Sequence, residues 1–233
     1  TLPSPTVNVG GGIFASAHDE LPYSRREIDR LEHELRDFPA RFGVAVGLER
    51  LETALGRKAP GDWNVLADFN DPDFRFGVVH FACHCASSAD AGALEAYLLL
   101  TANQRDIEMR AGQFLGRKKK GFRHSPLVFL NACASATPLH LLQSFKFPET
   151  LVRFGAGGVI ATACPVPDAF AGAFAAEFYH QLLLRCRGLD EFPTYVGDAL
   201  LATRRHFLTT YNNPLGLAYG LYAMSNQRLD LRP

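Results

Sequence analysis

The sequence has no long hydrophobic run and no excess of charge of either sign. No apolar stretch approaches the ~18 residues that a membrane-spanning helix requires, so we expect a protein that does not cross a membrane. The 24 basic and 24 acidic residues give a formal net charge of zero. Direct binding of nucleic acid is therefore not expected, because proteins that bind it carry clustered basic residues.

Cysteine is also scarce, with five residues in a chain of 233. The number is odd, and Cys83 and Cys85 lie too close together in an extended strand to pair easily with each other. This pattern does not fit a secreted disulfide framework and predicts a protein of the reducing cytoplasm. Because the chain begins at Thr1 without a methionine or a leader, we expect residues 1–233 to form a single domain cut from a larger protein.

Three short apolar runs stand out in the middle of the chain, and none of them alternates with polar residues. Continuous runs of this kind predict strands that are covered on both faces, as in a parallel sheet between layers of helices. Residues 94–115 are typical of strand or hairpin, and the apolar residues 217–224 predict a strand that closes the sheet. The three runs are Phe76–Cys83, Leu127–Ala132 and Gly158–Ala163.

Segments with helical periodicity lie on both sides of these runs. The first helix is predicted to begin at Ser24, which has capping-box spacing to Glu27, and to end before Pro39. A second helix is predicted over Asp168–Arg187 and a third near Pro193. The expected fold class is α/β, with a mostly parallel sheet flanked by helices.

His84 and Cys133 each come directly after an apolar run. Ligands bind beyond the carboxyl ends of parallel strands, and neighbouring strands lie about 4.8 Å apart, so an imidazole and a thiol could meet there. The imidazole would take the thiol proton and later protonate the departing amine. The backbone N–H groups of Cys133 and Cys85 would stabilise the oxyanion. Alternatively, each residue is structural, because cysteine is often buried and histidine often bonds a carbonyl.

The surrounding residues form three blocks in a fixed order, VVHFACHC, SPLVFLNACAS and GAGGVIATACPVPDAF. With the later DALLATRRHF and LAYGLYAM, they resemble the CHAT domain from about residue 75 to residue 224. The CHAT domain is a caspase-like branch of the cysteine peptidases related to separase. His84 and Cys133 are 49 residues apart, close to the separation of about 50 in caspases.

This resemblance implies a caspase-like three-layer sandwich in which His84 is the catalytic histidine and Cys133 the nucleophile. It also implies endopeptidase activity on protein substrates, without a metal or organic cofactor. Members of the family are commonly fused to, or controlled by, a sensor or scaffold in bacterial defence systems, so we expect such a partner. The alternative is a catalytically silent caspase-like module that binds partners.

The segment from Pro165 to Asp168 resembles the separase segment whose aspartate holds the arginine before the cleaved bond. The resemblance implies that Asp168 lines the S1 pocket and selects arginine through a bidentate pair. Asp168 could also cap the helix that it precedes.

The sequence departs from the family at three positions. Cys85 stands where the family usually has glycine, Ala134 where an acidic residue is common, and Cys164 where tryptophan is frequent. These departures suggest a divergent branch.

Two further patterns suggest other ligands. His80 and His84 would share one strand face while Cys83 and Cys85 share the other, so the four do not converge on a metal ion. Residues 10–12 are three glycines without a P-loop lysine, and we expect a turn or a flexible start there.

Two regions are expected to matter less to function. The basic residues Arg117–Lys120 are interpreted as a solvated loop and, if arginine is preferred, as a candidate site of self-processing. The residues before 75 are expected to add little to function beyond one helix that covers the sheet.

Overall fold

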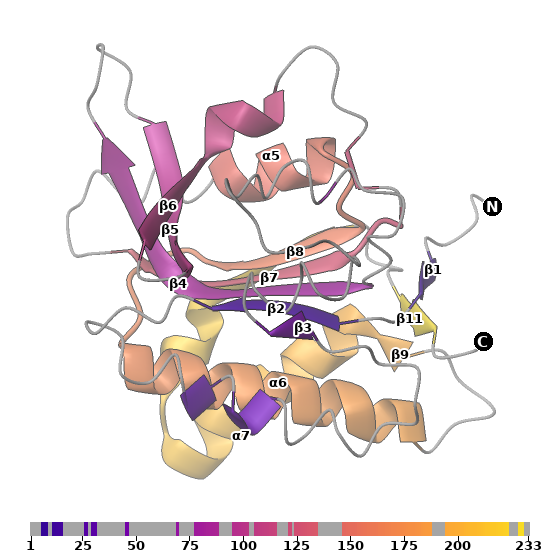
Figure 1. Ribbon diagram of the computed structural model, residues 1–233. Helices are drawn as coiled ribbons and strands as arrows, with labels where there is room; N and C mark the ends of the chain where they lie inside the picture. The colour runs from indigo at the N-terminus through magenta and orange to yellow at the C-terminus, as the bar shows by residue number, and fades with distance from the viewer. Residues whose placement is uncertain are drawn as a thin grey trace.

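A computed structural model of the chain describes the three layers that the sequence predicts, with a sheet between two layers of helices (Figure 1). The described residues are 6–8, 11–15, 26–27, 29–31, 45–46, 69, 77–88, 95–102, 105–115, 121–122, 124–134, 146–187, 194–223 and 228–230.

The central sheet has a parallel core. Its strands follow the order β10-β8-β7-β4-β2-β3, and β10 alone on this path runs antiparallel to its neighbour. The bounds are β2 (Gly11–Ala15), β3 (Ala45–Val46), β4 (Val78–Ser88), β7 (Leu127–Ala134), β8 (Gly158–Thr162) and β10 (Tyr219–Ala223). The three predicted strands and the closing strand are therefore confirmed.

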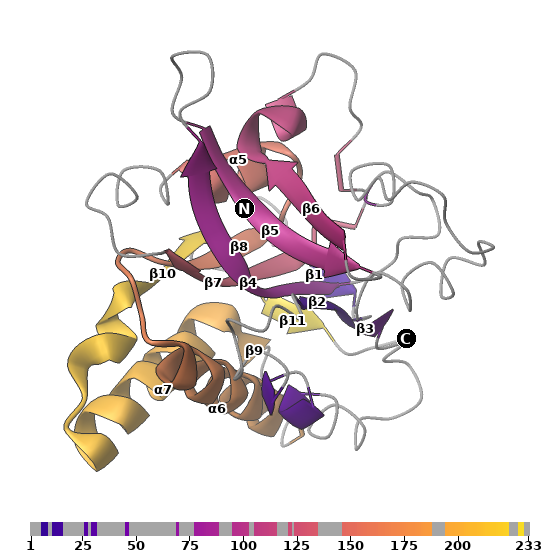
Figure 2. The same cartoon turned by 60° about the vertical axis from the view of Figure 1, so that its left-hand side comes forward.

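The predicted hairpin between the first two apolar runs is also present. It consists of β5 (Glu95–Ala102) and β6 (Arg105–Arg110), followed by a 3-10 helix, η2 (Ala111–Leu115). β5 pairs antiparallel with the far end of β4, and β6 pairs with β5. Figure 2 shows this hairpin rising from the sheet on the side of α5 (Lys146–Arg153).

Two longer helices cover the opposite face of the sheet (Figure 1). α6 spans Asp168–Arg187, as predicted, and packs against α7 (Val196–Tyr211). The helix predicted near Pro193 is confirmed as α7, which begins three residues later because β9 (Thr194–Tyr195) comes first. β9 joins β1 (Thr6–Asn8) and β11 (Arg228–Asp230) in a small separate sheet, and η3 (Pro214–Ala218) leads into β10.

The N-terminal part of the chain departs from expectation. Gly11 and Gly12 lie in β2, paired with Val78 and Val79 of β4, so the predicted turn was wrong for these two glycines. The predicted helix is confirmed at residues 26–27 and 29–31, here called the N-terminal helical segment. Gly10 and the basic residues 117–120 lie outside the described residues.

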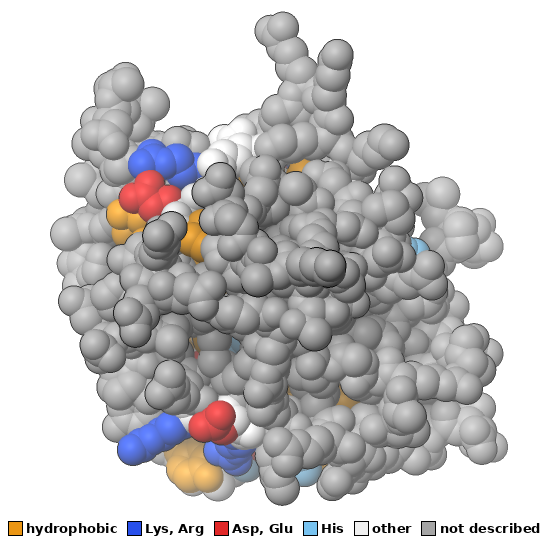
Figure 3. Space-filling view, in the orientation of Figure 1, with side chains coloured by type: hydrophobic (Ala, Val, Ile, Leu, Met, Phe, Trp, Pro, Cys, Tyr) orange, Lys and Arg blue, Asp and Glu red, His pale blue; other side chains and the backbone are white. Residues whose placement is uncertain are grey.

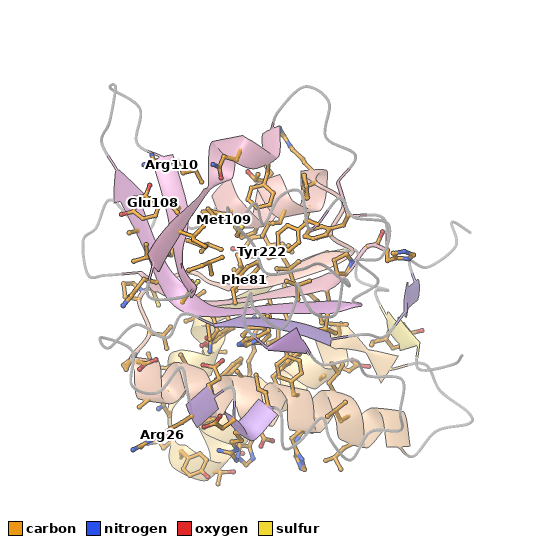
Figure 4. All side chains as sticks on the ribbon, viewed as in Figure 1. Arg26, Phe81, Glu108, Met109, Arg110 and Tyr222 are labelled. Atoms are coloured by element: carbon orange, nitrogen blue, oxygen red, sulfur yellow. The ribbon has the colours of Figure 1, made fainter. Side chains whose placement is uncertain are left out.

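Each face of the sheet carries its own core. Toward α5 and the hairpin, the core is rich in phenylalanine, with Phe81 of β4 among them. Figure 4 shows Phe81, Met109 and Tyr222 on this side of the sheet and Arg26 on the other. Toward α6 and α7, the core includes Leu31 and the aromatic residues Phe129, Phe174, Phe178, Tyr179 and Tyr219.

The described surface over β5 and β6 carries an ion pair (Figure 3). Arg110 Nη2 donates to Glu108 Oε2 at 2.6 Å, and the Arg110 guanidinium also lies over the Tyr97 ring. An exposed pair of this kind adds little stability, about 0–1 kcal/mol. In the part of the chain that the structure describes, no helix is both long enough and apolar enough to cross a bilayer.

Candidate active site

The register of the two central strands pairs the two residues predicted to carry the chemistry. β4 and β7 run parallel, and His84 is the register partner of Cys133. Partners in a parallel ladder lie at the same height on strands about 4.8 Å apart. His84 is half-buried, whereas the side chain of Cys133 lies outside the described residues.

The predicted strand ends were wrong at this point. β4 continues through His84 to Ser88, and β7 continues to Ala134. The reason is a change of neighbour on one side of β4, where β2 pairs with Val78–Ala82 and β5 pairs with His84–Ser88. His84 is therefore the first residue of β4 that pairs with β5, just beyond the carboxyl end of β2.

Cys85 follows His84 but belongs to the opposite face. It pairs with Leu98 of β5 and Ala134 of β7, so the backbone at Cys85 is part of a continuous strand. Its thiol packs against the phenylalanine-rich core, and burial raises the pKa of the Cys85 thiol to about 12. A thiol with such a pKa stays protonated and is a poor nucleophile near neutral pH.

A small cavity lies beside Cys85, between the sheet and α5. Its volume is about 20 Å³, enough for a single water molecule and too small for a substrate side chain. The lining residues are Cys85, Leu98, Leu130, Ala132, Phe147, Ala161 and Thr162.

Asp168 is the first residue of α6 and is half-buried. The N–H groups of Phe170 and Ala171 donate to the carbonyl of Pro167, so Pro167 rather than Asp168 is the N-cap residue. The carboxylate of Asp168 stands in the first turn, where the helix dipole favours a negative charge. α6 follows the carboxyl end of β8, the neighbour of β7, so its start lies at the same sheet edge as Cys133.

A buried polar network that was not predicted lies in the sheet core below this edge. Glu27 Oε1 accepts hydrogen bonds from His80 Nε2 of β4 and from Asn131 Nδ2 of β7, both at 2.7 Å. None of the three side chains is more than 4% exposed. One carboxylate oxygen from the N-terminal helical segment therefore joins the two strands that carry His84 and Cys133.

Two tyrosines extend the network into the helical layer and the sheet edge. Tyr179 of α6 lies 3.0 Å from His80 Nδ1, and Tyr219 of β10 donates to Asn131 Oδ1 at 2.8 Å. Burial, and then the negative charge of Glu27, raise the pKa of Tyr179 well above its usual value. Tyr179 therefore remains a hydroxyl donor.

These contacts involve three residues far apart in the sequence, His80, Glu27 and Asn131. His80 is fully buried, and its hydrogen-bond partners are a carboxylate and a phenol. The helix expected before residue 75 covers the sheet, and it also bonds to the sheet, because Glu27 accepts hydrogen bonds from two of its strands. The single polar residue Asn131 inside the run LVFLNA was the available signal for a buried polar site.

His80 and Cys83 lie on opposite faces of the sheet and do not face a common metal ion. Cys83 packs in the phenylalanine-rich core, and His80 bonds to groups on the opposite face. Among the residues that the structure describes, no group of three or more His, Cys, Asp or Glu could hold a metal ion.

Comparison with known families decides the relationship. The CHAT domain matches residues 13–207 of this chain. The chain belongs to the CHAT domain family. The match begins well before residue 75, the start expected from the sequence blocks, and so includes most of β2 and the N-terminal helical segment.

Relatives support a caspase-like peptidase family and its fold. A protein named a probable protease, from Vitiosangium sp. (strain GDMCC 1.1324), is 35% identical over 105 residues, which are 45% of this chain and 13% of that protein. Separase from Saccharomyces cerevisiae, solved in complex with securin, superposes with a TM-score of 0.55 at 14% identity. That superposition covers all of this chain and 13% of the separase chain.

A second structure of the yeast separase–securin complex superposes equally well. Its TM-score is 0.54 at 15% identity, with 99% of this chain and 12% of that chain covered. These similarities confirm the caspase-like three-layer sandwich. This CHAT domain chain spans about an eighth of the length of each of these relatives.

Proposed function

We propose that this chain is a cysteine endopeptidase in which His84 and Cys133 form the catalytic dyad. The observation that carries the proposal is the β4–β7 register, in which the two residues are partners. Their position where β2 ends and β5 replaces it beside β4 adds support, because ligands of parallel sheets bind beyond the carboxyl ends of the strands. The 35% identity to a probable protease supports the same reaction class.

The reaction follows from the chemistry of an imidazole and a thiol. His84 takes the proton of the Cys133 thiol, and the thiolate attacks the scissile carbonyl carbon to give a tetrahedral oxyanion. Collapse of this intermediate breaks the C–N bond, and His84 gives its proton to the amine that leaves. Water, deprotonated by His84, then hydrolyses the thioester and returns the free enzyme.

The oxyanion needs hydrogen-bond donors that are in place before attack. The backbone N–H groups of Cys133 and Cys85 are proposed for this role. Cys85 pairs with Leu98 and Ala134 in the sheet, so this role requires that its N–H makes no ladder hydrogen bond and points at the substrate oxygen. The neutral, buried thiol of Cys85 takes no part.

Asp168 is proposed to select arginine before the cleaved bond. Its half-buried carboxylate belongs to the segment that follows β8, next to the strand of Cys133. A carboxylate there suits the bidentate geometry of a guanidinium better than the point charge of lysine.

The proposed setting is a regulated protein of the cytoplasm. Because the matched region covers only about an eighth of each relative, we propose that this chain is one peptidase domain, residues 1–233, controlled by a sensor or scaffold in a bacterial defence or signalling system. The partner is then a protein, as securin is for separase. Among the described residues, Cys83, Cys85 and Cys164 are thiols outside any disulfide, in keeping with a reducing compartment.

Fluorogenic peptides test the activity and the specificity together. Peptides ending in Arg, Lys, Leu and Asp are incubated with the wild-type chain, Cys133→Ala and Asp168→Ala. We expect turnover of the Arg peptide above all others, loss of all turnover in Cys133→Ala, and loss of the Arg preference in Asp168→Ala. Identical product profiles for wild type and Cys133→Ala would favour a silent binding module instead.

A further inference from the structure

We propose that Glu27 is a positioning residue, whose carboxylate sets the relative placement of the two strands that carry the catalytic dyad. The inference rests on the proposed function of His84 and Cys133. The structural basis is the double hydrogen bond of Glu27 Oε1 to His80 Nε2 and to Asn131 Nδ2.

The burial of Glu27 makes this arrangement costly unless its partners are in place. Its side chain is 2% exposed, and His80 is completely buried. Moving a carboxylate out of water is unfavourable unless charged or polar donors replace the lost water. The network is therefore satisfied only when β4 and β7 present His80 and Asn131 to the same oxygen atom.

The directions of the hydrogen bonds agree along the whole network. Tyr219 donates to Asn131 Oδ1, and Asn131 Nδ2 donates to Glu27. In the tautomer of His80 that carries its hydrogen on Nε2, that N–H donates to Glu27, and Nδ1 accepts from the Tyr179 hydroxyl 3.0 Å away. Two arms thus run from α6 and β10 and converge on one carboxylate oxygen.

The network is close enough to the dyad to control it. Asn131 precedes Cys133 by two residues on β7, about 7 Å along the strand, and His80 precedes His84 by four on β4. Positions two and four apart fall on the same face of a sheet. Because a misplacement of about 1 Å between reacting groups can lower a rate about 100-fold, a tie between the strands at this depth affects catalysis.

Three variants separate positioning from stability. Glu27→Ala removes the acceptor, and Glu27→Gln keeps an acceptor oxygen without the charge. Leu31→Ala is the matched control, because Leu31 is fully buried on the same N-terminal helical segment and is outside the network. For each we measure kcat and KM on the Arg peptide, the thermal midpoint, and the rate at which iodoacetamide alkylates Cys133, mapped by mass spectrometry.

A positioning role predicts a specific pattern. Glu27→Ala lowers kcat at least about 10-fold with KM changed less than about 2-fold, as for a group that acts on the transition state. Glu27→Gln recovers most of kcat, and Leu31→Ala keeps kcat near the wild-type value although its thermal midpoint falls. Alkylation of Cys133 slows in Glu27→Ala and not in Leu31→Ala.

Two results would overturn the inference. One is an unchanged kcat and alkylation rate in Glu27→Ala. The other is an equal loss in Leu31→Ala at the same fall in thermal midpoint, which would make Glu27 merely structural. If the wild-type chain cleaves no peptide, the proposed function fails, and the alkylation rates still decide the role of Glu27. If Glu27→Ala does not fold, Asn131→Ala replaces it and is judged by the same measurements.

Discussion

The two faces of the central sheet are built differently. Among the residues that the structure describes, the face toward α5 is packed by six phenylalanines, and the buried polar side chains near it are threonines. The face toward α6 carries the buried carboxylate, imidazole and amide of Glu27, His80 and Asn131, surrounded by aromatic rings. His84 is on the same face of β4 as His80.

The two faces of the sheet contribute differently to the stability of the fold and to the placement of its strands. Apolar packing stabilises the folded state in proportion to the apolar surface that it removes from water. It tolerates small shifts between the packed side chains. A buried hydrogen-bonded network gains little net stability, but it is satisfied in only one geometry. The phenylalanine-rich face therefore supplies stability, and the polar face fixes the strands beneath the candidate active site.

The largest effect on stability is expected on the phenylalanine-rich face. Phe154 is 4% exposed and contacts the rings of Phe114 and Phe122 edge to face. Phe154→Ala should lower the free energy of unfolding by about 3–5 kcal/mol and leave kcat of the folded protein unchanged. Urea unfolding and peptide turnover at low temperature measure the two quantities. A large fall in kcat with little loss of stability would break the division between the faces.

A smaller effect is expected at the tyrosines of the polar face. Tyr179→Phe and Tyr219→Phe each remove a hydroxyl and leave a buried polar atom of His80 or Asn131 without this partner. Each should cost about 1–3 kcal/mol of unfolding free energy. Urea midpoints check this expectation, and two unchanged midpoints would mean that the network is not held by these bonds.

The smallest effect concerns alkaline pH. Burial raises the pKa of Cys85 to about 12 from an ordinary value of 9.0, so the folded chain keeps a proton that the unfolded chain loses. The contribution of Cys85 is complete below pH 9 and falls as the pH rises from 9 toward 12, by about 1 kcal/mol at pH 10. Cys85→Ala should flatten this part of a stability profile measured by urea unfolding. An unaltered slope would contradict the burial of the thiol.

Much of this fold could be predicted from local sequence. Phe76–Cys83, Leu127–Ala132 and Gly158–Ala163 are continuous apolar runs, and strands buried on both faces require such runs. The adjacency of His84 and Cys133 followed from their place after two of these runs. The bounds of α6 were predictable because its apolar stripe starts after Pro167 and ends before Gly188.

The rest depends on contacts distant in sequence. β4 extends to Ser88 because β5 pairs with it, and the small and polar residues 86–88 give no sign of that partner. Glu27 bonds to residues 53 and 104 positions away, and its capping-box spacing to Ser24 suggested a local role instead. Tertiary contacts of this kind override local patterns.

Covalent labelling tests the central claim, the pairing of His84 with Cys133, most directly. The chain is treated with a peptidyl-arginine acyloxymethyl ketone, and the modified peptide is identified by mass spectrometry in the wild type and in His84→Ala. We predict one adduct, on Cys133, formed at least about 100-fold more slowly in His84→Ala because the thiol loses its base. An adduct on Cys164, or equal rates in the two proteins, would contradict the dyad.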